Sequence, residues 1–326
     1  MPDQLDRDAA EMLRLREEAD LPDIVDMTPA EARALWDELA VVPEEHREPV
    51  DSVEERTVPG PDDRADEIPV RVYTPESVAS ASDDGAGAPV VVFFHGGGFV
   101  IGDLETRDAT CRALANDADC VVVSVAYRLA PEHPFPAAVA DAYAATEWVA
   151  DNPDAVGGDG RLAVSGDSAG GTLAAVVTLL ARDRDGPGID YQSLIYPGTS
   201  GSEDWDSYDE NETGYLLERS TVRYFYGHYF RHALERANPY AFPMAACSYE
   251  DLPPTTVLTC GFDPLRDEGL AYADVLESAG VDVSRLHYDD MIHGAITMLG
   301  EPGVTQARRM VEDLAADLRA GFETAE

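Results

Sequence analysis

A serine flanked by glycines is the first candidate for chemistry. Ser168 lies in the sequence Gly-Asp-Ser-Ala-Gly-Gly at residues 166–171. The apolar residues 162–164 before it favour a strand, and residues 172–180 after it favour a helix. A serine at such a turn is typical of a nucleophile elbow, whose strained backbone exposes the hydroxyl, although a serine there can also cap the helix. The strand–turn–helix context favours Ser168 as the nucleophile.

A run of glycines upstream suits the stabilisation of a negatively charged oxygen. The sequence His-Gly-Gly-Gly-Phe at residues 95–99 directly follows the apolar residues 90–94. Attack on an ester carbonyl produces a tetrahedral oxyanion, which needs backbone N–H donors about 3 Å away and no side chain in between. Gly97 and Gly98 are the candidate donors, and Ala169, the residue after the nucleophile, supplies the third.

The same glycines have a plainer interpretation as a flexible turn. Their position, about 70 residues before the serine, favours the functional interpretation. Gly96 is the less favoured donor. We expect His95 to fix the loop by hydrogen bonding and not to transfer a proton.

A nucleophilic serine needs a base, and the chain has seven histidines. Only His287 and His293 lie beyond residue 250. His293, in the sequence Met-Ile-His-Gly, follows the last predicted strand, where a loop returns to the edge of the sheet, whereas His287 lies within that strand. We therefore expect His293 to take the serine proton and later to donate it to the leaving group.

The acid that orients this base should lie between the serine and the histidine in the chain. Asp263 follows the apolar residues 257–258, at the end of a predicted strand. Among 64 acidic residues an aspartate means little by itself, so its position at the strand end carries the argument. Asp263 is expected to hold one tautomer of His293 and to stabilise the imidazolium, and Asp267 is expected to cap the next helix.

Apolar runs alternate with helical patterns along most of the chain. Runs that are apolar on both faces suit the central strands of a parallel sheet covered by helices, and two further strands precede them, joined by a turn at residues 59–63. The predicted strands are residues 53–58, 68–73, 90–94, 121–125, 162–164, 194–195, 257–258 and 281–286. The predicted helices are residues 107–118, 136–151, 169–184, 267–279 and 305–322. The alternation predicts a layered α/β fold, with an exposed loop at residues 75–88.

Two segments break the alternation. Residues 1–45 predict two amphipathic helices, the second starting with a capping box at Thr28. Residues 201–246 are rich in tyrosine, phenylalanine and histidine and predict inserted helices. The two segments can form a lid over the strand ends, but aromatic residues at helical spacing also suit plain core packing. The α/β core is then residues 46–200 and 247–326.

The charge balance limits the partners. The chain has 64 acidic and 23 basic residues, a formal net charge of −41, and every basic residue is arginine. The negative charges of such a surface repel one another in dilute buffer, and in about 1 M salt the screening length falls to roughly 3 Å, so the repulsion largely disappears. An ordinary acidic protein is the alternative, but the absence of lysine favours halophilic adaptation. The same charge argues against nucleic acid and anionic membranes as partners.

The remaining bulk features indicate a cytoplasmic protein. The N-terminal residues lack the basic start and apolar stretch of a signal peptide, and no run has the 18 or so apolar residues of a membrane helix. No zinc-binding spacing of cysteine and histidine occurs, and no metal or cofactor is expected. The scattered cysteines are expected to be reduced, buried thiols: Cys111, Cys120, Cys247 and Cys260.

Taken together, the motifs resemble those of the hormone-sensitive lipase family of α/β-hydrolases. The matching motifs are HGGGF (95–99), YRLAPEHPFPAA (127–138), GDSAGG (166–171), NPYAFP (238–243), GFDPLRDEG (261–269) and MIHG (291–294). The resemblance implies an α/β-hydrolase fold, with a mostly parallel eight-stranded sheet flanked by helices and a helical lid. The implied catalytic residues are Ser168, Asp263 and His293, and the implied oxyanion donors are Gly97, Gly98 and Ala169.

The resemblance also implies an activity, hydrolysis of short- to medium-chain carboxylic esters. Family members usually have phenylalanine where this chain has Ala295, which predicts more room near the base. The acidity of the chain fits a haloarchaeal homologue.

Three hypotheses about function remain open at this point. The leading one is a serine carboxylesterase that acts on small-molecule esters through an acyl-enzyme. The second is a deacetylase or amidase that uses the same three side chains, which do not discriminate between the two. The third is a non-catalytic binding module, which the presence of His293 disfavours. A true lipase is disfavoured because no long exposed apolar segment suggests attachment to an interface. The edge strands of the sheet leave homodimer formation open.

Overall fold

The sheet at the centre of the molecule has eight strands, in the order β1-β2-β4-β3-β5-β6-β7-β8. The computed structural model describes residues 4–61, 67–81 and 87–324, so parts of the predicted turn at 59–63, the loop at 75–88 and both terminal segments lie outside the described residues. The strands are β1 (Ser52–Val58), β2 (Ile68–Thr74), β3 (Ala88–Phe94), β4 (Val121–Val125), β5 (Gly158–Asp167), β6 (Tyr191–Ile195), β7 (Thr255–Phe262) and β8 (Val283–Ile292). The predicted layered α/β fold is confirmed.

The strand pairing is mostly parallel. The first two pairs, β1–β2 and β2–β4, are antiparallel, and the other pairs run parallel from β4 to β8. In β3 and β4 every second side chain enters one core and the residues between enter the other: Val92 and Val123 pack on one face, Val91 and Val122 on the opposite face. Because both faces are covered, these strands are apolar throughout, as the sequence indicates.

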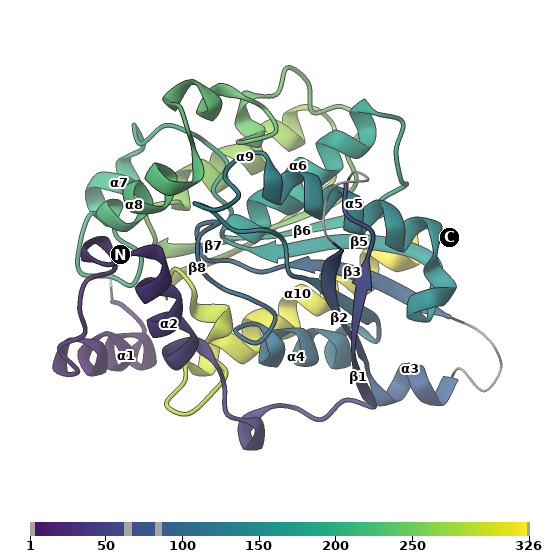
Figure 1. The fold of residues 1–326 in the computed structure, drawn as a ribbon, viewed down its shortest axis with the longest axis horizontal. Coiled ribbons are helices and arrows are strands. Elements are labelled where there is room, and N and C mark those ends of the chain that lie inside the picture. The colour runs from purple at the N-terminus through teal and green to yellow at the C-terminus, as the bar shows by residue number, and fades with distance from the viewer. Residues whose placement is uncertain (1–3, 62–66, 82–86, 325–326) are drawn as a thin grey trace.

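Helices cover both faces of this sheet (Figure 1). One face packs against α4 (Asp108–Ala118) and α10 (Thr305–Thr324), and the other against α5 (Ala137–Asp151), α6 (Ala169–Asp183) and α9 (Arg266–Ser278). Each helix begins within one residue of its predicted start and ends within two of its predicted end. β3 and β5 are neighbours in the sheet, but β3 is followed in the chain by β4 on one side and β5 is followed by β6 on the other side. The loops after β3 and β5 therefore face each other at the point where the strand order reverses. Ligands of open α/β sheets bind outside the carboxyl ends of the strands at such points.

The N-terminal segment (residues 4–45) and the insertion (residues 201–246) lie together at one end of the sheet. Figure 1 shows α1 (Arg7–Glu18) and α2 (Pro29–Ala40), in purple, beside α7 (Asp206–Glu210) and α8 (Arg219–Tyr229), in green. The hydroxyl of Tyr224 donates to the carbonyl of Met27, 3.2 Å away, which joins the two segments directly. The predicted capping box starts α2, because Thr28 and Glu31 each accept the backbone N–H of the other.

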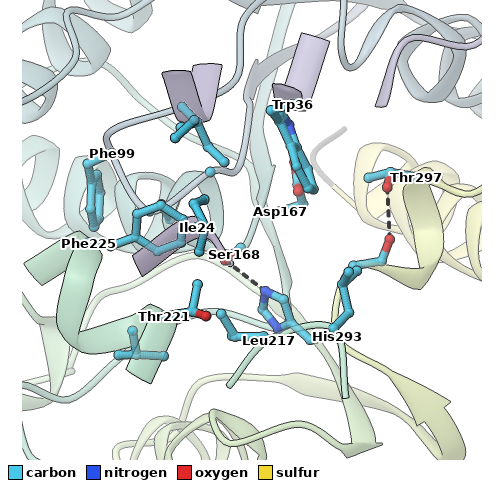
Figure 2. A pocket seen from close by; sticks show the side chains of 18 of the residues that line it. Ile24, Trp36, Phe99, Asp167, Ser168, Leu217, Thr221, Phe225, His293 and Thr297 are labelled. Carbon is cyan, nitrogen blue, oxygen red and sulfur yellow. Dashed lines mark hydrogen bonds between the residues drawn. The ribbon is translucent and has the colours of Figure 1, made fainter. Parts of the chain in front are cut away.

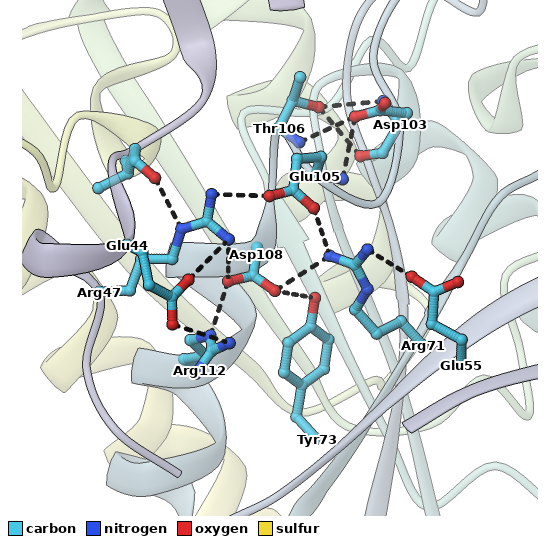
Figure 3. Close-up of polar contacts among 11 residues, drawn as sticks. Glu44, Arg47, Glu55, Arg71, Tyr73, Asp103, Glu105, Thr106, Asp108 and Arg112 are labelled. Atoms are coloured by element: carbon cyan, nitrogen blue, oxygen red, sulfur yellow. Dashed lines mark hydrogen bonds and ion pairs between the residues drawn. The ribbon is translucent and has the colours of Figure 1, made fainter. Parts of the chain in front are cut away.

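A cluster of buried charges attaches the end of the N-terminal segment to the core (Figure 3). Asp108, which is 1% exposed, accepts hydrogen bonds from Arg47 (2.9 Å), Arg71 (3.1 Å) and Arg112 (2.6 Å), and from the hydroxyl of Tyr73. Arg47 also donates to the carbonyl of Val42. Since removing one partner of a buried ion pair leaves an uncompensated charge, this cluster fixes where the N-terminal segment joins the sheet.

Three expectations from the sequence about local structure are corrected. The predicted loop at 75–88 contains a helix, α3 (Glu76–Ala81), in which the buried side chain of Val78 provides the apolar contact. Cys247 is exposed, whereas the other three cysteines are buried, and all four are free thiols. The strand predicted at 281–286 starts two residues later and extends to Ile292, so its end carries the next residue, His293, to the carboxyl edge of the sheet.

Candidate active site

The turn after β5 holds Ser168 in a strained conformation. Its φ is +56° and its ψ is −118°, outside the regions that side chains ordinarily allow, and α6 begins at the next residue. The strand and the helix approach so closely that a Cβ on Gly170 would lie 1.9 Å from the carbonyl oxygen of Phe94. The glycine is therefore required by the close packing of the elbow against β3.

Three side chains distant in sequence form one hydrogen-bonded chain. Nε2 of His293 lies 2.9 Å from Oγ of Ser168, and Nδ1 of the same ring lies 2.8 Å from Oδ2 of Asp263. Asp263 is fully buried and His293 is 7% exposed. The contact with the carboxylate assigns the Nδ1 proton to the Asp263 side of the ring, which leaves Nε2 free to accept the serine proton.

Local contacts hold the Asp263 carboxyl in place. Its second oxygen, Oδ1, accepts the backbone N–H of Leu265 at 2.8 Å, and the side chain of Asn211 donates to its backbone carbonyl at 3.2 Å. Asp267 does not contact His293, and the prediction that it caps α9 is wrong. It lies in the first turn of that helix and accepts the backbone N–H of Ser207 at 2.8 Å.

The glycine loop after β3 presents backbone N–H groups to the same cavity as the serine. Gly97 has a φ of +120° and Gly98 a φ of +60°, and a Cβ on Gly97 would lie 2.2 Å from the carbonyl of Ile101. Within the described residues the N–H groups of Gly97, Gly98 and Ala169 donate to no protein acceptor. All three residues line the cavity with Ser168, so they are available for an oxygen bound there.

A buried ion pair links the glycine loop to the elbow. Asp167 accepts the backbone N–H of Gly96 at 2.8 Å and receives two hydrogen bonds of 2.9 Å from the guanidinium of Arg107. Both side chains are almost completely buried, and a Cβ on Gly96 would lie 2.3 Å from the Asp167 carboxyl. Gly96 is thus engaged in the scaffold, in keeping with its lower rank as an oxyanion donor.

His95 packs behind the glycine loop. Its ring stacks on Tyr127 at 4.2 Å, and the Tyr127 hydroxyl donates to the His95 carbonyl at 2.6 Å. Nδ1 of His95 lies 2.8 Å from the carbonyl of Gly96. Burial lowers the pKa of His95 to about 4, so the ring is neutral at neutral pH. The contacts suit the role of fixing the loop that the sequence predicts.

The sequence reasoning missed Arg107, Asn211 and Tyr196, whose ring packs 4.5 Å from that of His293. Arg107 lies in no recognisable motif and reaches Asp167 only because α4 starts beside the elbow. Asp167 stands next to the predicted nucleophile, and that position was the one available signal.

The cavity above Ser168 has a volume of about 120 Å³ and a mostly apolar lining. Figure 2 shows the Ser168–His293 contact between side chains of the N-terminal segment, Ile24 and Trp36, and side chains of the insertion, among them Leu217. Ala295, where the sequence predicts more room, is fully buried and does not line the cavity, whereas Gly294 and Thr297 do.

The described residues hold neither a metal-binding group nor a membrane-spanning helix. No group of three or more histidine, cysteine or acidic side chains there is arranged to hold a metal ion. None of the helices in the described ranges is long and apolar enough to cross a bilayer.

Comparison with known proteins identifies the family. A family model described as "alpha/beta hydrolase fold" matches residues 91–297, more than half of the chain. The chain belongs to this α/β-hydrolase family. The matched range nearly coincides with the part of the chain that carries the six motifs, and the predicted α/β-hydrolase fold with its mostly parallel eight-stranded sheet is confirmed.

Proteins similar to this α/β-hydrolase are named as esterases. Esterase LipI of Mycobacterium tuberculosis is 46% identical over 251 residues, which cover 76% of this chain and 77% of the relative. An ester hydrolase from the metagenome of Lake Arreo, solved with a bipyridine phosphonate derivative, has a TM-score of 0.90 at 38% identity and covers 98% of this chain and 100% of its own. A hyperthermophilic esterase from the archaeon Pyrobaculum calidifontis has a TM-score of 0.89 at 41% identity, with 98% and 99% covered.

Proposed function

We propose that this α/β-hydrolase is a serine carboxylesterase whose nucleophile is Ser168. His293 removes the hydroxyl proton as Oγ attacks the carbonyl carbon of the ester, and a tetrahedral intermediate forms. The imidazolium, stabilised by Asp263, then returns the proton to the departing alkoxide, which leaves an acyl-enzyme. Water activated by His293 attacks the acyl carbon and releases the carboxylic acid.

Backbone donors balance the charge that develops during this reaction. The N–H groups of Gly97, Gly98 and Ala169 bind the oxyanion of each tetrahedral intermediate. Their positions are supported by the left-handed backbone of the two glycines and by the absence of a competing acceptor in the described residues. The reaction uses no metal or cofactor.

The observation that carries the proposal is the unbroken chain from Asp263 through His293 to Ser168 at the cavity floor. The esterase names of the relatives support the same reaction class. We propose short- to medium-chain acyl esters as substrates, since the cavity above Ser168 is small, apolar and covered on two sides.

Replacement of the nucleophile tests the proposal. Ser168→Ala should lower kcat for p-nitrophenyl butyrate by about 10⁵- to 10⁶-fold, as expected when the nucleophile of such a triad is lost. Ser165→Ala is the matched control, because Ser165 lies in β5, the strand that leads to Ser168, and lines no described cavity. Its buried hydroxyl has no hydrogen-bond partner within the described residues. Turnover by Ser168→Ala well above that of the buffer contradicts the mechanism. Amides matched to the esters establish whether the same site also cleaves amides.

We also propose that the N-terminal segment and the insertion act as a lid domain over the core of residues 46–200 and 247–326. Both segments line the cavity, and one hydrogen bond joins them directly. We also propose a cytoplasmic location and no membrane or nucleic-acid partners, supported by the composition. A homodimer formed through an edge strand is proposed because the sheet ends in the edge strands β1 and β8.

We further propose that the enzyme is adapted to molar salt. The support is the net charge of −41 and the absence of lysine. The proposal of a haloarchaeal source has the same composition as its support, because the relatives compared above come from other organisms. Because salt screens the repulsion, the melting temperature should rise steeply between 0.1 and 3 M KCl, concentrations chosen to span roughly 10 to under 3 Å of screening length. A melting temperature that stays constant over this range contradicts the adaptation.

A further inference from the structure

A second cavity adjoins the first beneath the N-terminal helices. It has a volume of about 360 Å³ and lies between α1, α2 and the chain that follows β8. The two cavities share one wall, and the side chains that line both are Arg16, Leu21, Trp36, Leu39, Leu216 and Thr297. A substrate group that extends from Ser168 beyond the first cavity therefore meets this wall.

Almost all of the second cavity is apolar. Its lining includes Met12, Leu13 and Ile292, and its two charged side chains are Arg16, on the shared wall, and Glu301. In the first cavity the other arginine, Arg107, is neutralised by its pair with Asp167. Among the described residues, Arg16 is therefore the one charged side chain on the wall that the two cavities share.

Arg16 has no carboxylate partner among residues 4–61, 67–81 and 87–324, although the chain has a large excess of carboxylates. Within the described residues it forms no ion pair, whereas Arg14, two residues earlier on the same helix, pairs with Glu11 and Glu18. The other arginines near the cavity, such as Arg33 and Arg107, also have carboxylate partners. A free guanidinium beside an apolar cavity matches an anion that arrives with a ligand.

The helix that carries Arg16 is attached to the catalytic edge. The backbone N–H of Asp6 donates to the carbonyl of Asp290 at 2.8 Å, three residues before His293, and the backbone N–H of Thr305 donates to the Asp8 carboxyl at 3.0 Å. These contacts fix the start of α1 relative to the proposed base. The helical register then fixes the end of α1, where Arg16 lies in the last turn.

We propose that Arg16 binds a carboxylate at the far end of the substrate, so that the enzyme prefers esters whose apolar chain ends in an anionic group. The ester carbonyl lies at Ser168, the methylene chain follows the apolar lining toward the second cavity, and the terminal carboxylate pairs with the guanidinium. Half-esters of linear dicarboxylic acids have this chemistry. Their hydrolysis consumes one water and yields an alcohol and a dicarboxylic acid.

This inference rests on the proposed esterase function, and the two are tested separately. Hydrolysis of neutral ethyl esters by the wild-type enzyme tests the esterase function alone. The anion preference is the ratio of kcat/KM for a monoethyl dicarboxylate to kcat/KM for the ethyl ester of the fatty acid of equal length. The series runs through succinate, adipate, suberate and sebacate, each paired with its fatty-acid ester.

The discriminating experiment compares Arg16→Gln with Arg14→Gln. Both remove one charge from the same helix, but Arg14 lines neither cavity and already has carboxylate partners. The ratio should fall by about two- to five-fold in Arg16→Gln, the range for a solvent-accessible ion pair, and stay constant in Arg14→Gln. The fall should be largest at one chain length, because only one spacer brings the carboxylate to the guanidinium.

Arg16 also lies where it interacts favourably with the helix dipole, and a role confined to the helix would lower the melting temperature without changing the ratio. An unchanged ratio in Arg16→Gln, or an equal fall in Arg14→Gln, overturns the proposal even if neutral esters are hydrolysed well.

Discussion

The catalytic edge and helix α2 of its cover are held by different kinds of contact. At the edge, the Arg107–Asp167 pair and the Asp263 carboxyl are buried. In the cover, formed by the N-terminal segment and the insertion, the partner of Arg33 on the core is the half-exposed Glu132. Buried charged contacts are strongly destabilising to break, whereas exposed pairs contribute at most about 1 kcal/mol. The difference indicates that the edge determines whether ester chemistry occurs and that the cover determines which ester is bound.

The largest effect is expected at the acid of the catalytic edge. Asp263→Asn should lower kcat by about 10⁴-fold, since the amide no longer selects the tautomer of His293 that accepts the serine proton. Stopped-flow assays with p-nitrophenyl butyrate measure the loss. Asp267→Asn is the matched control, because Asp267 contacts Ser207 and not His293. Equal losses in the two variants would remove Asp263 from the mechanism.

A smaller loss is expected when the support of the glycine loop is removed. Arg107→Gln leaves Asp167 without its guanidinium and loosens the carboxylate that holds the Gly96 N–H. We expect kcat to fall by about 10- to 100-fold, somewhat less than the loss of an oxyanion donor itself. The affinity for a trifluoromethyl ketone, which forms the tetrahedral adduct, should fall in parallel.

The pair of the partly exposed Arg128 with the buried Asp141 provides the control for this variant, because neither residue lines the cavity above Ser168. Arg128→Gln should lower the melting temperature with little change in kcat. If Arg107→Gln lowers the affinity for a non-hydrated methyl ketone as much as the affinity for the trifluoromethyl ketone, Arg107 supports general packing and not the oxyanion site.

Acid sensitivity should reveal the burial of His95. Burial lowers its folded-state pKa to about 4, and the unfolded value is about 6.5. Stability from this group is therefore complete above pH 6.5 and is lost as the pH falls toward 4, because the unfolded chain binds the proton first. When the pH falls from 6.5 to 5.5, the free energy of unfolding of the wild type should decrease by about 1 kcal/mol more than that of His95→Asn, as measured by urea unfolding. Parallel stability curves for the two proteins would mean that His95 is solvated.

The smallest effect is expected in the cover. The guanidinium of Arg33 on α2 donates to the carbonyls of Val100 at 2.8 Å and Ala130 at 2.7 Å. Arg33→Ala should raise KM about threefold and change kcat by less than about twofold, because a looser α2 weakens ester binding without moving the catalytic edge. A fall in kcat comparable to that of Arg107→Gln would contradict the division between edge and cover.

Local sequence signals were sufficient for the strands, the helices and the residues at the strand ends. The apolar run of β3, the glycines around Ser168 and the position of His293 after β8 each have a local physical reason, so the sequence alone indicates them. By contrast, the Arg107–Asp167 pair joins residues 60 positions apart, and no local sequence pattern indicates it. Helix α3 was missed because residues 75–88 are rich in serine, alanine, glycine and aspartate, a composition typical of loops, which outweighs the contact that Val78 makes.

The arrangement of the cover was the least predictable part. The sequence indicates helices in both segments, but it does not indicate that Arg16 and Trp36 would line both cavities, because that depends on how α1 and α2 cross the strand ends. Their crossing is set by tertiary contacts such as that of Asp6 with Asp290, which have no periodicity to reveal them.

The most direct test of the proposed mechanism is the site of covalent labelling. The enzyme is treated with a fluorophosphonate and digested, and the modified residue is identified by mass spectrometry. The proposed mechanism predicts one adduct, on Ser168, formed in step with the loss of esterase activity and absent from Ser168→Ala. An inactivated enzyme that carries its adduct on another residue, with Ser168 unmodified, would contradict it.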